Sequence, residues 1–205
     1  MNYEILLSFI IASATLAIAP GPDNIYVLLQ SITHGKACGL ATVGGLISGC
    51  IVHTTLVAFG VSAIIKSNDA LFFIIKLFGA GYLLYLAYKV FRHDSQISLN
   101  GMTVPKKSLG QLYKQGVIMN VLNPKVSIFF LAFFPGFLFS DNIGTVVQFY
   151  VLGGIFMIVS MIIFSGIAIL SGTISNYIKR FSKVGVVLKW LQIVVFVGIA
   201  IFILL

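Results

Sequence analysis

Charged side chains are scarce in this sequence, and acidic ones are the scarcest. Only 9% of the 205 residues are charged, and they comprise 5 Asp or Glu against 13 Lys or Arg. A soluble domain carries roughly 25% charged residues because its surface faces water. A chain with so few charges cannot cover such a surface, so the composition excludes a soluble protein and indicates lipid as the main solvent.

Cysteine and histidine are also scarce. The two cysteines, Cys38 and Cys50, have neither the spacing of a zinc site nor that of a disulfide framework. The apolar runs contain no serine–histidine, two-histidine or paired-carboxylate arrangement, and no phosphate-binding glycine loop with its lysine. We therefore expect no enzyme, no metal site, no cofactor and no nucleotide-driven pump.

The formal net charge of +8 invites a nucleic-acid interpretation, but the distribution of the charges argues against it. The basic residues lie in short segments between apolar runs, where Lys and Arg mark the cytoplasmic side of a membrane protein. We therefore expect the chain to associate with a lipid bilayer and with no nucleic acid.

Long apolar runs are what the sequence has in abundance. Each meets the roughly 20 residues that a transmembrane helix needs, and none shows the alternating polarity of a barrel strand. We predict an all-α membrane protein with six transmembrane helices. The runs cover residues 5–31, 39–65, 70–91, 116–139, 143–174 and 184–205.

The order of the runs predicts a single membrane domain, 1–205, built from two halves. Half one covers 1–92, a cytoplasmic linker covers 93–115, and half two covers 116–205. With six spans, the basic segments all fall on one side, and the positive-inside rule then places both termini outside. Three spans per half make the halves inverted relative to each other, which is typical of inverted-repeat transporters.

A Pro-Gly-Pro sequence interrupts the first run. Because proline has no amide proton, Pro20 frees the carbonyl of Leu16 from its helical hydrogen bond. We predict that the helix breaks here and resumes near Pro22, with Asp23 and Asn24 in the first turn of its second part.

The fourth run contains a comparable interruption. Pro124 frees the carbonyl of Asn120, and Lys125 follows directly. Asn120 and Asn123 are three residues apart, so their amides share one helix face. A second break is expected at Pro135.

Broken helices at matching places in two halves predict a transporter binding site. Free amides at a helix start suit a carboxylate, and unpaired carbonyls suit an ammonium; an amino acid carries both groups. A charge near the bilayer centre costs at least roughly 2.5–3.5 kcal/mol, so Asp23 and Lys125 need a partner or a cavity. We expect them to pair in one state, where substrate or a proton competes for one partner. The predicted substrate-binding or translocation residues are Pro20, Gly21, Pro22, Asp23, Asn24, Asn120, Asn123, Pro124 and Lys125.

The residues alone leave alternatives open. Prolines and glycines also bend membrane helices for packing, and Lys125 also has the length to reach the interface. Free carbonyls are equally compatible with an ion channel or ion carrier, and a non-transporting membrane scaffold is a further alternative. The oligomeric state is open, with a homo-oligomer among the alternatives.

Four motifs together resemble the LysE/RhtB family of amino-acid exporters. They are APGPD at 19–23, GAGYL at 79–83, NVLNPK at 120–125 and PGF at 135–137. The resemblance implies a multi-pass protein of the bacterial cytoplasmic membrane that exports amino acids or their derivatives by antiport with protons. Threonine, homoserine, leucine, cysteine-like compounds and basic amino acids all fall within that class, and the motifs do not choose between them.

Overall fold

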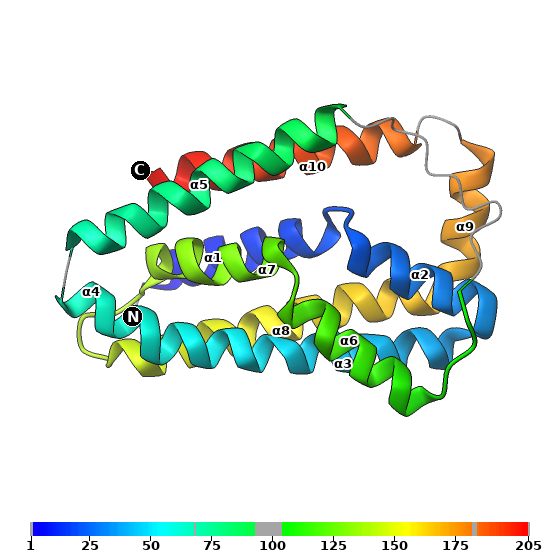
Figure 1. The fold of residues 1–205 in the computed structure, drawn as a ribbon, viewed down its shortest axis with the longest axis horizontal. Helices are drawn as coiled ribbons and strands as arrows, with labels where there is room; N and C mark the ends of the chain where they lie inside the picture. Colours follow the sequence, from blue (N-terminus) through cyan, green and yellow to red (C-terminus); the bar gives the residue numbers. More distant parts are fainter. Residues whose placement is uncertain (1, 68, 93–103, 182–183, 205) are drawn as a thin grey trace.

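The structure, a computed structural model, describes residues 2–67, 69–92, 104–181 and 184–204. These residues form helices and short connections with no strand among them, which confirms the all-α prediction (Figure 1). The elements are α1 (Tyr3–Ile18), α2 (Pro22–His34), α3 (Lys36–Leu56), η1 (Val57–Val61), α4 (Ser62–Ser67), α5 (Asp69–Arg92), α6 (Leu109–Val121), α7 (Pro124–Ile128), η2 (Phe129–Phe133), η3 (Phe134–Phe137), α8 (Thr145–Ile169), α9 (Ser171–Arg180) and α10 (Val184–Leu204).

The apolar helices give the chain four to six membrane spans. Four stretches are long and apolar enough to cross a bilayer: Lys36–Ile64, Ala70–Arg92, Thr145–Ile169 and Val184–Leu204. The α1–α2 pair is bent by 59° at its break, and α6 is bent by 49° against the segment that begins with α7. If each bent pair is one span, the total is six. The protein is therefore a multi-pass membrane protein.

Two boundaries differ from those expected. The fourth run was expected to begin at residue 116, but α6 begins at Leu109. The reason is a capping box, in which the Ser108 hydroxyl accepts from the amide of Gln111 and the Gln111 side chain accepts from the amide of Ser108. At the end of the fifth run, α8 stops at Ile169, and α9 then crosses one end of the molecule (Figure 1). Residues 93–103 of the expected linker lie outside the described residues.

The broken helices lie between two helix pairs (Figure 1). On one side, α5 packs against α10, and both contact η2. On the other side, α3 packs against α6 and α8, while α1 packs against α8. The two broken helices run in opposite directions. The amide of Asn2 before α1 donates to the carbonyl of Phe139 after η3 (2.9 Å), while His34 at the end of α2 bonds the carbonyl of Val104 ahead of α6 (2.8 Å).

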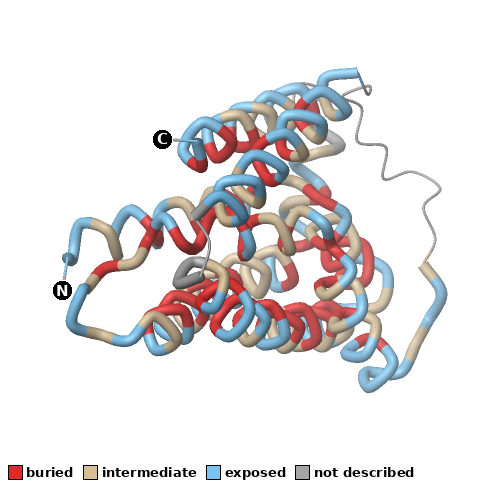
Figure 2. The backbone as a smooth tube through the Cα atoms, turned by 60° about the vertical axis from the view of Figure 1, so that its left-hand side comes forward, coloured by how far each residue is buried: buried red, intermediate tan, exposed pale blue. Residues whose placement is uncertain are grey.

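Large apolar side chains cover much of the outside of this bundle. Leu7, Phe78, Ile162 and Val187, from four different helices, are each more than half exposed. The buried residues concentrate where the helices face one another (Figure 2). An apolar exterior around a packed interior fits a protein whose outer solvent is lipid.

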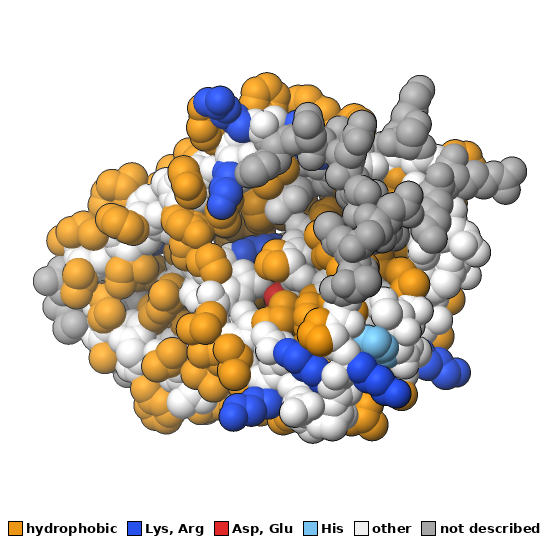
Figure 3. All heavy atoms as spheres, turned by 45° about the vertical axis from the view of Figure 1, so that its right-hand side comes forward, with side chains coloured by type: hydrophobic (Ala, Val, Ile, Leu, Met, Phe, Trp, Pro, Cys, Tyr) orange, Lys and Arg blue, Asp and Glu red, His pale blue; other side chains and the backbone are white. Residues whose placement is uncertain are grey.

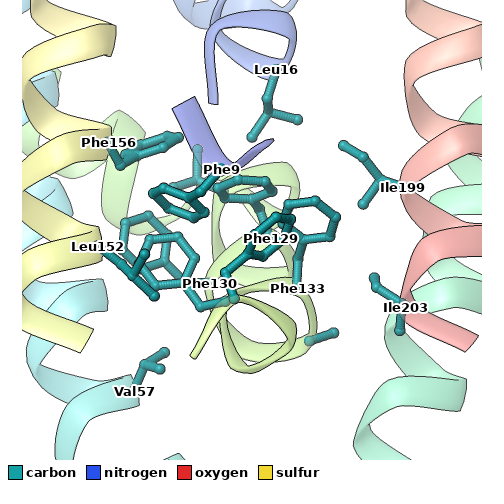
Figure 4. Packing of buried hydrophobic residues seen from close by; sticks show 14 of the residues in the cluster. Phe9, Leu16, Val57, Phe129, Phe130, Phe133, Leu152, Phe156, Ile199 and Ile203 are labelled. Carbon is teal, nitrogen blue, oxygen red and sulfur yellow. The ribbon is translucent and has the colours of Figure 1, made fainter. Parts of the chain in front are cut away.

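Phenylalanines fill the interior beyond the two breaks (Figure 4). The ring centroids of Phe130 and Phe134 lie 4.1 Å apart, and those of Phe129 and Phe133 lie 4.7 Å apart. Phe9 of α1 meets Phe134 edge to face at 5.0 Å. These rings come from α1, η2 and η3, and they fill the interior of the half of the bundle that contains the start of α1.

Glycines set how closely α3 approaches α6. A Cβ atom added to Gly45 would collide with the backbone of Tyr113, and one added to Gly116 would collide with the backbone of Thr42. The helix backbones can approach this closely only because neither glycine has a side chain. The approach brings α6 and its break against α3.

We predict that Gly45→Ala lowers stability by about 1–3 kcal/mol, because the new methyl meets backbone that cannot rotate away. Gly44→Ala is the matched control, since its Cβ would meet only the Tyr113 ring at 3.6 Å, an ordinary contact. The measurement is unfolding of the purified protein in detergent. Equal stability of the two variants would contradict the account.

Candidate functional site

The breaks in the two bent helices face each other at the centre of the molecule. The first break leaves Gly21 in an extended conformation ahead of α2, which begins at Pro22 as predicted. The second leaves Asn123 as the N-cap of α7, where its side-chain oxygen accepts from the amide of Lys125 at 3.0 Å. In both places proline occupies the first helical position, where its missing amide proton costs no hydrogen bond.

A short hydrogen bond joins the two breaks. Asn123 Nδ2 donates to Asp23 Oδ2 at 2.6 Å, and both side chains are buried. A carboxylate in a buried position needs such a donor, because an unpaired buried charge is strongly destabilising. Asn123 therefore does two things: its oxygen caps α7, and its nitrogen holds Asp23.

Lys125 crosses between the broken helices. Its Nζ atom donates to the carbonyls of Leu16 and Ala19, at 2.9 Å each. The Leu16 carbonyl is the one that Pro20 was predicted to free. A cation at the C-terminal end of α1 is also favoured by the helix dipole.

The direct ion pair between Asp23 and Lys125 that we expected in one state is not formed in this one. Both residues are described, and their charged groups contact other partners: Asn123 for the carboxylate and the α1 carbonyls for the ammonium. The two charges are still close enough to interact electrostatically. The carbonyls at the end of α1 offer the ammonium two hydrogen bonds, which explains this choice.

Two other backbone carbonyls near the breaks are bonded by side chains. Asn24 Nδ2 donates to the carbonyl of Ala17 at 2.8 Å. The Asn120 carbonyl, which Pro124 was predicted to free, lies 3.1 Å from His53 Nε2. A carbonyl only accepts, so Nε2 carries the proton in this contact. This bond gives the buried His53 a structural role at the second break.

A cavity of about 480 Å³ reaches the breaks from one end of the bundle. Figure 3 shows its mouth as a hollow with basic side chains inside and an acidic one at its base. Its lining consists of Pro20, Gly21, Pro22, Ile25, Tyr82, Leu86, Lys89, Val90, Asn123, Pro124, Lys125, Gly185, Leu188, Lys189, Gln192 and Phe196. Six of the predicted site residues therefore border open space rather than packed helix: Pro20, Gly21, Pro22, Asn123, Pro124 and Lys125.

A second, smaller cavity of about 20 Å³ lies behind the breaks. Asp23 Oδ1, Asn120 Oδ1 and Ser160 Oγ belong to residues that line it, and these buried atoms have no hydrogen-bond partner among the described residues. A space of this size holds about one water molecule, and the oxygens supply the polar partners that such a water needs. Lys125 and Asn123 line both cavities.

The structure thus brings the nine predicted site residues together, and it adds others that sequence reasoning missed. Tyr82 and Lys89 were not among the predicted site residues, but both line the main cavity. Ser160 was not predicted either, although it is a polar residue in the middle of an apolar run, and it lines the smaller cavity.

The groups at the two breaks can bind a small polar molecule. Among the described residues, no group of three or more His, Cys, Asp or Glu side chains is placed to hold a metal ion. What the site offers is two backbone carbonyls for an ammonium, one lysine for a carboxylate and asparagine amides beside them.

Comparisons with known proteins agree with this description. A family model described as LysE type translocator matches residues 14–205. The homoserine/homoserine lactone efflux proteins of Salmonella typhimurium and Salmonella typhi are 30% and 31% identical over 179 residues, covering 87% of this chain and 86% of theirs. The leucine efflux protein of Salmonella choleraesuis is 29% identical over 181 residues, covering 87% and 85%. No solved structure matches the chain.

We predict that Asn123→Asp destabilises the protein, because it places a second carboxylate against Asp23 while keeping the cap of α7. The loss of a hydrogen bond to a charged group alone costs about 1.5–3 kcal/mol. The exchanged pair, Asp23→Asn with Asn123→Asp, restores an amide-to-carboxylate bond and regains most of that loss. Thermal unfolding of the two singles and the double measures this coupling; purely additive effects would contradict it.

Proposed function

Because the chain belongs to the LysE type translocator family, as its motifs predicted, we propose that it exports amino acids or their derivatives across a bacterial cytoplasmic membrane. The family is one of transporters, so the protein is not an enzyme. Relatives named for the efflux of homoserine, homoserine lactone and leucine support an amino-acid substrate.

The observation that carries the proposal is a cavity that reaches the central site from one side. The 480 Å³ space lies between the α5–α10 pair and the two breaks, and Lys125 and the first break border it. On the other side of the breaks, phenylalanine rings from α1, η2 and η3 fill the interior. Access from one side to a central site is what a carrier needs, whereas a channel needs a continuous path.

In this state Lys125 stands in for the ammonium group of a substrate. It donates to the two carbonyls at the end of α1 that would otherwise receive an amino group. Arrival of a substrate exchanges one ammonium for the other, and Lys125 is then released to bind the substrate carboxylate. The remaining predicted residues support this exchange in two ways. The residues that keep the carbonyls exposed are Pro20, Gly21, Pro22 and Pro124. The residues that hold the ends of the helices are Asn24, Asn120 and Asn123.

Proton coupling is assigned to Asp23. Its Oδ1 atom is buried without a hydrogen-bond partner among the described residues, and it faces the small cavity. A proton bound there would remove the charge that holds Asn123 and favour movement of the two breaks apart. Release of the proton would restore the hydrogen bond, so proton binding and substrate binding alternate.

The proposed topology has six spans in two inverted halves, 1–92 and 116–205, joined by a cytoplasmic linker. The opposite directions of α1–α2 and α6–α7 support it, since each broken helix begins the half to which it belongs. Lys89 and Lys189 lie at the mouth of the cavity, and the positive-inside rule makes that end cytoplasmic. Both termini then lie outside, and the site faces the compartment from which an exporter loads.

We predict that Asp23→Asn and Lys125→Met each reduce efflux from loaded proteoliposomes by about tenfold or more, because each removes one partner of the exchange. Asp23→Asn also abolishes acceleration by an imposed pH gradient. Exposed residues provide matched controls with the same chemical changes, Asp141→Asn and Lys114→Met. Normal efflux by both site variants would remove the proposed site, and steady conductance without proton coupling would favour an ion channel.

The topology is tested by cysteine labelling in a background without Cys38 and Cys50. A membrane-impermeant maleimide added to intact spheroplasts should label Asn2→Cys but not Lys114→Cys, and membrane disruption should expose the latter. Labelling of both positions in intact spheroplasts would require a different number of spans.

A further inference from the structure

An amino acid bound at the two breaks has one group left to contact the rest of the cavity. Its ammonium takes the place of Lys125 at the α1 carbonyls, and its carboxylate binds Lys125, which belongs to α7. Both backbone groups are therefore held by the broken helices. The other wall of the main cavity comes from α5 and α10, so the side chain of the substrate faces these two helices.

Gln192 lies on that wall close to the breaks. It is one helical turn before Phe196 on α10, and both residues line the main cavity. The Phe196 ring is buried, and its centroid lies 5.9 Å from Lys125 Nζ. Because one turn of helix is about 5.4 Å long, Gln192 stands where the side chain of a bound amino acid would extend.

The wall around Gln192 is mainly apolar. The apolar residues that line it are Leu86 and Val90 of α5 and Leu188 and Phe196 of α10. A polar group of a substrate that enters this part of the cavity gives up contacts with water, and it needs a protein partner in exchange. On such a wall, a single polar side chain decides which substrates find that partner.

Gln192 and Tyr82 are uncharged polar residues on this wall, and both are partly buried. The Gln192 amide both donates and accepts hydrogen bonds, and so does the Tyr82 hydroxyl on α5. Neither side chain hydrogen-bonds another residue within the part of the chain that the structure describes. A hydroxyl group on a substrate also donates and accepts, so it fits the Gln192 amide in either direction.

We propose that Gln192 determines which side chains this transporter accepts, by hydrogen bonding a short, uncharged polar side chain such as a hydroxyl. Amino acids that carry a hydroxyl are then favoured over apolar amino acids of the same shape. Tyr82 supports the same contact from α5. The inference rests on the proposed function and makes it more specific, because it names the residue that selects among amino acids and the chemical class that it selects.

Matched pairs of amino acids test the preference. Homoserine and norvaline differ only in a hydroxyl against a methyl, and so do threonine and valine. Each is loaded in labelled form into proteoliposomes that contain the full-length protein, and its efflux is measured. We expect the hydroxyl member of at least one pair to leave about threefold or more faster, which is the effect of one neutral hydrogen bond. Equal or slower efflux of the hydroxyl member in both pairs would overturn the proposal.

Gln192→Met tests the residue itself, because methionine keeps the length of the side chain and removes both hydrogen-bonding groups. The hydroxyl-to-methyl efflux ratio should fall about threefold or more, with efflux of the methyl member retained. Gln115→Met makes the same chemical change outside the cavity lining and should leave the ratio unchanged. An unchanged ratio in Gln192→Met would overturn the assignment.

The contribution of Tyr82 is tested in the same assay. Tyr82→Phe removes only the hydroxyl and should lower the ratio by a smaller factor than Gln192→Met. Tyr85→Phe is the matched control, since Tyr85 is more than half exposed and lies outside the cavity lining. Equal ratios in the two tyrosine variants would remove Tyr82 from the contact.

The two levels of the proposal fail differently. If the wild type transports none of the four probes and no leucine, amino-acid export itself is wrong. If it transports both members of each pair equally well, export stands and selection by Gln192 is wrong. Gln192→Asn withdraws the amide by one methylene group, so it tests the same contact if Gln192→Met does not fold.

Discussion

Backbone carbonyls cannot be left unpaired inside a lipid bilayer, and this constraint organises the centre of the protein. Prolines interrupt two helices, and Pro20 leaves the Leu16 carbonyl without its helical donor. Side chains from distant parts of the sequence take over: Lys125 bonds Leu16 and Ala19, and His53 bonds Asn120. The structure is held together at its breaks by groups that a continuous helix would not need.

These bonds also explain why the broken helices must lie side by side. Lys125 and Leu16 are 109 residues apart in sequence, and Asn123 and Asp23 are 100 apart. Asn24 satisfies the Ala17 carbonyl within the first half, but the Leu16 and Ala19 carbonyls depend on Lys125 of the second half. A carbonyl that accepts its hydrogen bond from a side chain can accept one from a ligand instead. The same positions are therefore suited to binding a ligand.

Sequence reasoning located both breaks because proline chemistry is local. The absence of an amide proton at position 20 identifies the Leu16 carbonyl without any knowledge of the fold. Which donor bonds that carbonyl depends on the tertiary structure. Lys125 was expected to pair with Asp23, but it bonds the Leu16 carbonyl, and Asn123 bonds Asp23. The cavity wall was missed for the same reason. Tyr82 and Lys89 resemble ordinary interfacial residues until α5 is placed beside α10.

The energetics of Lys125 suit a side chain that must leave the α1 carbonyls when substrate binds. A lysine in the middle of a membrane costs roughly 2.5–3.5 kcal/mol on insertion scales. Hydrogen bonds to a charged group each return about 1.5–3 kcal/mol, and Lys125 makes two of them to the end of α1. Two such bonds together return about 3–6 kcal/mol, so they offset the cost. An incoming ammonium that makes the same two bonds replaces Lys125 with little change in free energy, because one charged donor takes the place of another on the same carbonyls.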